Sequence, residues 1–115
     1  MARKQKLGGQ TYQIKTGCGA LYVTINEDNG KPVEVFATMG KAGGCAASQN
    51  EAVGRVISLA LRSGVDIKKI IKQLSNISCH AAMIIGEQKV MSCADAIAQT
   101  LKQYQSEKKD ENDEP

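Results

Sequence analysis

Alternation of apolar and polar residues marks the first third of the chain as β-structure. Every second residue between positions 20 and 26 is apolar, which is the pattern of a half-buried strand. The pair Asn29-Gly30 follows, and this dipeptide favours a tight hairpin turn. Strands are expected on either side, over residues 11–16 and 32–39. The sequence therefore predicts a three-stranded antiparallel meander.

After the meander, apolar residues recur at the three- and four-residue spacing of amphipathic helices. A first helix is expected over residues 46–62, and Gly64 is placed to end it. The predicted apolar stripe of this helix consists of Val53, Val56, Ile57, Ala60 and Leu61.

Two further helices are expected. Asp66 is placed to cap a short helix. Ser92 is placed to open a helix that runs to Tyr104, with Asp95 as its partner in a capping box. Residues 75–89 are expected to form a connector. Because strands come first and helices after, the predicted fold is α+β, with three helices packed on one face of the meander.

Length and charge indicate one small domain with two unlike ends. The chain has 115 residues, of which 42% are hydrophobic, and this suits a single core. Residues 1–10 are expected to form a flexible basic arm, residues 11–105 the domain, and residues 106–115 an acidic disordered tail. From Glu107 onward five carboxylates outnumber two lysines, so the rest of the chain has a net charge of +6. A basic body is compatible with a nucleic-acid or nucleotide partner.

Composition narrows the classes of protein. Aromatic residues make up only 3%, which counts against a stacking platform for single-stranded nucleic acid. No apolar stretch is long enough to span a membrane, and the first residues lack the apolar segment of a secretory leader. A cytoplasmic location is therefore expected, where cysteines are reduced thiols or metal ligands rather than disulfides.

The most informative candidates are the four cysteines, Cys18, Cys45, Cys79 and Cys93. No two of them form a Cys-x-x-Cys pair, which counts against a zinc ribbon or finger. Cys18 lies between two glycines in an expected turn, and Cys45 and Cys93 open expected helices, where the dipole favours the metal-binding thiolate. The set is predicted to bind zinc or an iron–sulfur cluster. Packing of the thiols in the core is the alternative.

Two other features supply further candidate site residues. His80, the one histidine, directly follows Cys79 and is an additional candidate ligand, and a Cys–His hydrolase is left open. The glycine-rich turn with Lys41, Gly43 and Gly44 lacks the Ser or Thr of a phosphate loop but precedes an expected helix. It is a candidate for contact with an anion or a partner, with a simple tight turn as the alternative.

Four blocks of the sequence resemble the TSCPD domain family, which is named for its Thr-Ser-Cys-Pro-Asp motif. They lie at residues 16–24, 34–45, 57–64 and 92–98. This family occurs near the C-terminus of adenosylcobalamin-dependent (class II) ribonucleotide reductases and also as a free-standing small protein. All four cysteines are kept here. The motif itself reads Met91-Ser92-Cys93-Ala94-Asp95, without the Thr and the Pro, and His80 stands where the family commonly has Pro.

The resemblance implies a small accessory module of deoxyribonucleotide synthesis. It does not imply catalysis by this chain, because 115 residues leave no room for the catalytic barrel and no cysteine pair lies near the C-terminus. Any reductase activity would belong to the parent enzyme. The implied partner is the catalytic chain of a ribonucleotide reductase, and adenosylcobalamin is expected only in that partner.

A more distant likeness is to NifU-like iron–sulfur scaffolds, which share the order of elements. It implies that Cys18, Cys45 and Cys93 are the core ligands and that Cys79 is the fourth. Three alternatives therefore stay open beside the accessory module: an iron–sulfur cluster-binding or scaffold protein, a nucleic-acid-binding accessory protein, and a thiol redox partner of the reductase.

Overall fold

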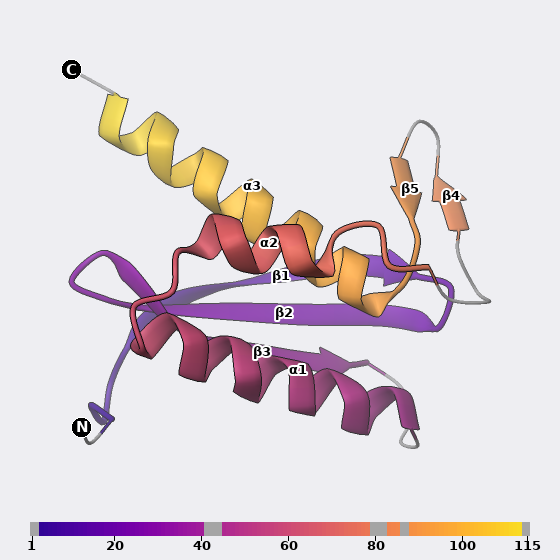
Figure 1. Cartoon of the computed structure of the whole chain (residues 1–115), viewed down its shortest axis with the longest axis horizontal. Helices are drawn as coiled ribbons and strands as arrows, with labels where there is room; N and C mark the ends of the chain where they lie inside the picture. The colour runs from indigo at the N-terminus through magenta and orange to yellow at the C-terminus, as the bar shows by residue number, and fades with distance from the viewer. Residues whose placement is uncertain (1–2, 41–44, 79–82, 86–87, 114–115) are drawn as a thin grey trace.

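A computed structural model describes residues 3–40, 45–78, 83–85 and 88–113, and at positions 45, 83–85, 88 and 110–113 it describes the backbone alone. The chain forms three strands, then two helices, a short hairpin and a last helix (Figure 1). These elements are β1 (Gly8–Thr16), β2 (Gly19–Asp28), β3 (Lys31–Met39), α1 (Cys45–Arg62), α2 (Ile67–Leu74), β4 (Met83–Ile85), β5 (Gln88–Val90) and α3 (Cys93–Asp113). The predicted α+β fold, a three-stranded meander followed by three helices, is confirmed.

Two tight turns set the register of the antiparallel sheet, whose order is β1-β2-β3. At the second turn Asn29 and Gly30 have positive φ angles of 54° and 77°, as a primed hairpin turn requires. At the first turn Thr16 pairs with Gly19, whose φ of 126° strongly favours glycine. This register places every second residue of β2 on the same face, namely Leu21, Val23 and Ile25.

The core lies on that face of the sheet. Apolar side chains of β2 and β3 meet apolar side chains of all three helices, and the main contributors are Leu21, Val23, Ile25, Val35, Ile57, Ile70, Ile97 and Leu101. The opposite face carries the exposed residues Thr11, Gln13 and Thr38 and the ring of Phe36, which is 49% exposed. One face of the sheet is therefore packed and the other is open.

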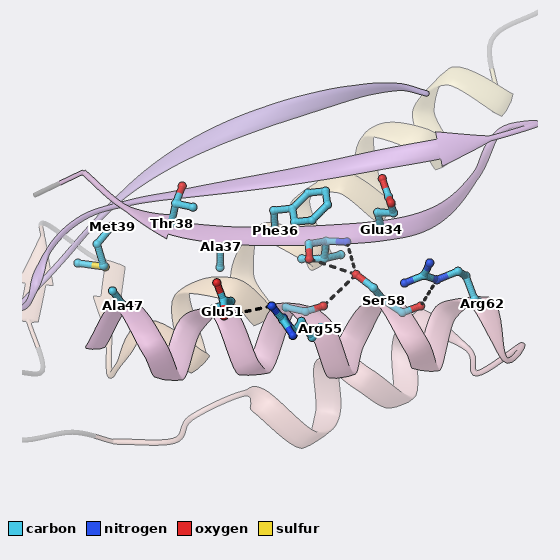
Figure 2. Close-up of a pocket in the computed structure, with 12 residues that line it drawn as sticks. Glu34, Phe36, Ala37, Thr38, Met39, Ala47, Glu51, Arg55, Ser58 and Arg62 are labelled. Carbon is cyan, nitrogen blue, oxygen red and sulfur yellow. Dashed lines mark hydrogen bonds and ion pairs between the residues drawn. The ribbon is translucent and has the colours of Figure 1, made fainter. Parts of the chain in front are cut away.

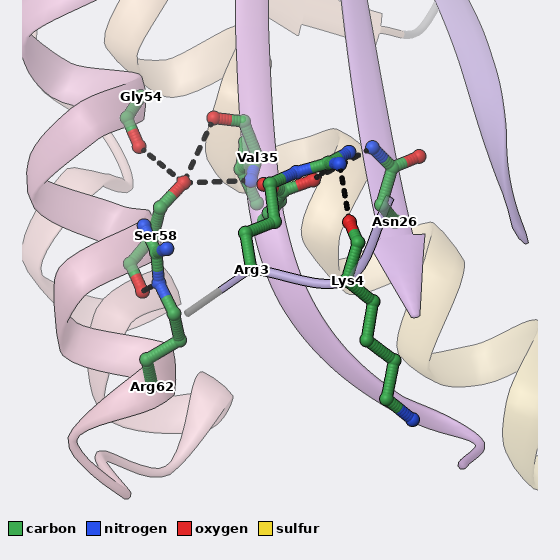
Figure 3. Close-up of polar contacts among 8 residues, drawn as sticks. Arg3, Lys4, Asn26, Val35, Gly54, Ser58 and Arg62 are labelled. Atoms are coloured by element: carbon green, nitrogen blue, oxygen red, sulfur yellow. Dashed lines mark hydrogen bonds and ion pairs between the residues drawn. The ribbon is translucent and has the colours of Figure 1, made fainter. Parts of the chain in front are cut away.

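Helix α1 lies along the outer edge of β3, where its Ser58 hydroxyl hydrogen-bonds to the outward-facing backbone of Val35 (Figure 3). The hydroxyl of Ser58 accepts a hydrogen bond from the backbone N–H of Val35 at 2.9 Å. It lies 3.2 Å from the Val35 carbonyl oxygen and 2.9 Å from that of Gly54, so it can donate to either. The helix comes this close because Gly54 has no Cβ, which would lie 2.9 Å from the Val35 oxygen. The edge of β3 is thus covered.

Several boundaries differ from the sequence prediction. Strand β1 begins at Gly8 and α3 continues to Asp113, so regular structure extends into the segments expected to be an arm and a tail. The expected connector over residues 75–89 contains β4 and most of β5. Val56, predicted on the apolar stripe of α1, is 66% exposed, because α1 contacts β3 through Gly54 and Ser58 on another side of the helix.

None of the helices in the described part of the chain combines the length and the apolar character needed to cross a membrane.

Candidate functional site

Three of the four cysteine-bearing segments lie at the same end of the molecule. These are the β1–β2 turn with Cys18, the start of α1 at Cys45 and the start of α3 at Cys93 (Figure 1). Both helices begin at a cysteine, as the sequence predicted. Cys79 and His80 fall outside the described residues, and so do Lys41, Gly43 and Gly44 of the predicted anion or partner contact.

Thr16 joins the turn of Cys18 to the start of α3. Its hydroxyl is buried, donates a hydrogen bond to the Gly19 carbonyl at 2.9 Å and accepts one from the Cys18 N–H at 3.1 Å. The same oxygen lies 3.9 Å from the sulfur of Cys93. Sequence reasoning did not single out Thr16, although Ser and Thr hydroxyls often bond to the backbone two residues on in turns.

The two described thiols differ in environment. Cys18 is exposed at the tip of the turn, whereas Cys93 is half-buried and packs against the core. The Thr16 hydroxyl bonds the turn amide of one and approaches the sulfur of the other, so both cysteines belong to one local structure. The alternative to metal binding is that the thiols simply pack in the core. The partial burial of Cys93 is compatible with this alternative, whereas the exposure of Cys18 is not.

Asp95 holds the start of α3 in place. The Ser92 hydroxyl accepts a hydrogen bond from the Asp95 N–H at 3.0 Å, which is the predicted cap. The buried Asp95 carboxylate accepts hydrogen bonds from the N–H of Asn76 at 2.8 Å, the N–H of Met91 at 3.0 Å and the Gln99 side chain at 2.9 Å. The capping box is therefore altered, because Asp95 bonds the amide of Met91 rather than that of Ser92.

The Asp95 contacts tie two separate segments of the chain to the start of α3. Asn76 follows α2 and Met91 precedes α3, so one carboxylate ties both segments to the residue pair Ser92-Cys93. The backbone that carries Cys93 is consequently fixed from two directions.

Cysteine thiolates are the kind of ligand that a soft metal ion prefers. Thiolates supplied from separate segments at one end of a domain are the usual ligands of zinc and of iron–sulfur clusters. Within residues 3–40, 45–78, 83–85 and 88–113, no three Cys, His, Asp or Glu side chains form a group that could hold a metal ion. Two of the proposed thiols, those of Cys45 and Cys79, are not among the described side chains.

A second candidate is a groove of about 440 Å³ between β3 and α1 (Figure 2). Phe36 and Thr38 line it from the strand, and Arg55 and Arg62 line it from the helix. Arg55 pairs with Glu51 at 3.4 Å, and the Arg62 Nε donates a hydrogen bond to the Ser58 carbonyl at 3.3 Å. An exposed ring beside two guanidinium groups suits a flat or anionic ligand.

Glu34 lies in the same groove, and its charge is neutralised by Arg3. The Glu34 carboxylate accepts hydrogen bonds from two nitrogens of Arg3, at 2.5 Å and 3.0 Å, and one from Asn26 at 3.0 Å (Figure 3). The bond to Arg3 holds the pKa of Glu34 below its ordinary value, although burial opposes this by raising that pKa. The N-terminal segment is thus anchored to β3.

Comparison with known proteins identifies the family. The TSCPD domain family matches residues 2–105. No curated protein and no solved structure matches the chain, so the likeness to NifU-like scaffolds stays a prediction. The match contains all four cysteines and the residues from Thr16 to Asp95 that build the end of the molecule described above. Because it leaves out only the first residue and the last ten, the chain belongs to the TSCPD domain family.

Proposed function

We propose that this chain is an accessory module of class II ribonucleotide reductase whose cysteines bind a metal ion. Membership of the TSCPD family supports the relation to the reductase. The main support for a metal site is that the Thr16 hydroxyl contacts both the turn of Cys18 and the sulfur of Cys93, which brings two thiol-bearing segments together. The proposed ligands are Cys18, Cys45, Cys79 and Cys93, with His80 as an additional candidate.

Zinc is the preferred metal, with an iron–sulfur cluster as the alternative. A zinc ion held by thiolates would cross-link the β1–β2 turn to the starts of α1 and α3 and would contribute folding free energy. The protein residues orient the ligands: Thr16 fixes the turn of Cys18, and Asp95 fixes the backbone before Cys93. This role needs no electron transfer, which is why zinc is preferred.

The metal proposal is tested by elemental analysis and visible absorption of protein purified without oxygen. Zinc near one equivalent per chain is expected, and it should be lost in Cys18→Ser and in Cys93→Ser. Ser63→Ala, which changes an exposed residue after α1, is the matched control and should keep the metal. Iron with sulfide would favour the cluster-binding alternative. Metal-free protein in every preparation would overturn the shared-ligand proposal.

The partner proposal needs a separate test. In the cytoplasm, the module would dock on the catalytic chain of a class II ribonucleotide reductase, which would hold adenosylcobalamin. Size-exclusion chromatography of the purified chain with that catalytic chain should give co-elution, and the metal-free protein should bind more weakly. Separate elution at concentrations of about 50 μM would contradict the proposal, whatever the metal content, because a stable protein interface is saturated at that concentration.

The β3–α1 groove gives some support to the second candidate function, a nucleic-acid-binding accessory protein. Phe36 could stack on a base while Arg62 contacts a phosphate. Fluorescence anisotropy with a labelled oligothymidylate tests this candidate. Binding that falls steeply with salt and is lost in Phe36→Ala, but kept in Thr11→Ala on the same open face, would favour it. Equal binding by both variants would remove the groove from consideration.

A further inference from the structure

The two edges of the sheet differ in whether another element covers them. The edge of β3 is covered by α1, whose Ser58 bonds the outward-facing groups of Val35. At the other edge, the hairpin closes at the pair Thr16–Gly19, and backbone groups then face β2 at every second residue. The N–H and C=O groups of Thr11, Gln13 and Lys15 therefore point away from the sheet. No strand in the described part of the chain pairs with this side of β1.

A groove of about 580 Å³ runs beside this open edge. One wall is β1 itself, and the other is the exposed side of α3. The polar residues of the lining are Gln13, Lys15, Gln99, Lys102, Gln103 and Ser106. The groove therefore combines strand groups that pair with no described strand and side chains that can hydrogen-bond, and both features suit a peptide in extended conformation.

The positive charge of this groove indicates which kind of peptide would bind in it. Among the described residues, its lining contains two lysines and no carboxylate. The ion pairs among the described residues are Arg3–Glu34, Lys4–Asp28, Arg55–Glu51 and Lys108–Glu27, so no described carboxylate pairs with Lys15 or Lys102. A second copy of β1 would bring another lysine and no acidic side chain into the same space. Charge thus favours an acidic segment over a second copy of this chain.

We propose that an extended acidic segment of a partner protein adds to β1 as a fourth strand. Its backbone would bond the outward groups of Thr11, Gln13 and Lys15. Because side chains alternate along a strand, acidic residues on one face would meet Lys102 of α3, and those on the other face would meet Lys15. Backbone pairing would supply affinity, and the two lysines would supply the preference for acidic side chains. This inference does not depend on the metal site.

The test uses the full chain labelled with nitrogen-15 and a synthetic peptide that repeats Glu-Glu-Val-Val, which places glutamate on both faces of an extended strand. Adding the peptide should slow amide hydrogen exchange at Gln13 and Lys15 by about tenfold or more, which corresponds to about 1.4 kcal/mol per amide. The amides of Tyr12 and Ile14 already face β2 and serve as internal controls. The same peptide with lysine in place of glutamate should have no such effect.

Four variants separate backbone pairing from charge. Gln13→Pro removes an outward N–H and should weaken peptide binding about tenfold or more, whereas Gln13→Ala keeps this N–H and should bind normally. Lys102→Glu should weaken binding to a similar extent, and Lys109→Glu, exposed farther along α3, should not.

Three results would overturn the proposal. The first is unchanged exchange at Gln13 and Lys15 with about 1 mM peptide. The second is equal binding of the lysine peptide. The third is a dimer in sedimentation equilibrium that Gln13→Pro converts to a monomer, since a second copy would then occupy the edge.

Discussion

At the scale of single residues, one hydroxyl supplies a hydrogen-bond partner for the outward-facing N–H of Val35 at the edge of β3. Ser58 is buried, and its oxygen is the described partner of the Val35 N–H. A serine inside a helix more often bonds back to the carbonyl four residues earlier, and Ser58 also lies within reach of that of Gly54. Its second contact, across to the strand, turns an ordinary helix residue into a link between two elements.

Ser58→Ala should lower the free energy of unfolding by about 1–3 kcal/mol, because it leaves the Val35 N–H buried without a partner. Urea denaturation followed by circular dichroism measures this change. Ser48→Ala removes an exposed hydroxyl from the same helix and should change stability by less than about 0.5 kcal/mol. Equal effects of the two substitutions would show that the contact with Val35 contributes nothing.

At the scale of elements, the packing of α1 on β3 depends on a residue that weakens the helix itself. Glycine inside a helix costs about 1 kcal/mol relative to alanine. Here the cost is offset by the close approach of the helix backbone to the strand. A Cβ on Gly54 would meet the Val35 oxygen at 2.9 Å and the Phe36 Cα at 3.6 Å, and both are backbone atoms that cannot rotate away.

Gly54→Ala is therefore expected to destabilise the protein, by about 1–3 kcal/mol, although the same change in an exposed helix would stabilise it. Thermal unfolding gives the sign directly. Ala52→Gly, at an exposed position one half-turn away, should lower stability by about 0.5–1 kcal/mol and calibrates helix propensity in α1. A more stable Gly54→Ala protein would mean that α1 can move off the strand freely.

At the scale of the whole molecule, contacts between distant parts of the chain hold the layers together. Arg3 reaches Glu34 across 31 positions, and the Asp95 carboxylate joins the segments after α2 and before α3. Glu27 of β2 bonds both the Tyr104 hydroxyl and Lys108 of α3. The last of these contacts explains why α3 extends past Tyr104, since the acidic composition of the tail does not exclude a helix that is tied to the sheet.

The Arg3–Glu34 contact should make stability depend on pH in a defined direction. Because the pKa of Glu34 is lower in the folded chain than in the unfolded one, its contribution to stability is fully present above the ordinary carboxyl pKa. It is lost as the pH falls through the lowered pKa of the folded state. Arg3→Ala should thus have a lower free energy of unfolding than the unsubstituted protein at pH 7, and this difference should become smaller as the pH falls.

Urea denaturation at pH 7 and at about pH 3 measures that difference. Lys4→Ala is the matched control, because the Lys4–Asp28 pair is more exposed to solvent and such pairs contribute little. The difference in stability between Arg3→Ala and the unsubstituted protein could instead stay constant with pH. That result would show that Arg3 acts through packing and not through the charge of Glu34.

Local sequence patterns predicted where most of the candidate site residues lie along the helices and turns. They did not predict which of these residues contact one another. The turn at Cys18 and the helix starts at Cys45 and Cys93 follow from glycines and a capping serine, which act over a few residues. Thr16 was missed because its role needs a partner 77 residues away, the Cys93 sulfur. The hairpin of β4 and β5 was missed because each strand has only three residues, too short to show a period.

The sequence by itself determined the order of strands and helices, the Asn29-Gly30 turn and the apolar face of β2, because periodicity and turn chemistry are properties of neighbouring residues. Tertiary structure alone decided which sheet edge is covered. A glycine inside a helix, such as Gly54, can mark a close packing contact, but neither Gly54 nor Ser58 indicates that α1 lies on the backbone of β3. Nothing around Gln13 indicates that the other edge stays open. These outcomes depend on how separate elements fit together in space, and only the packed molecule specifies that.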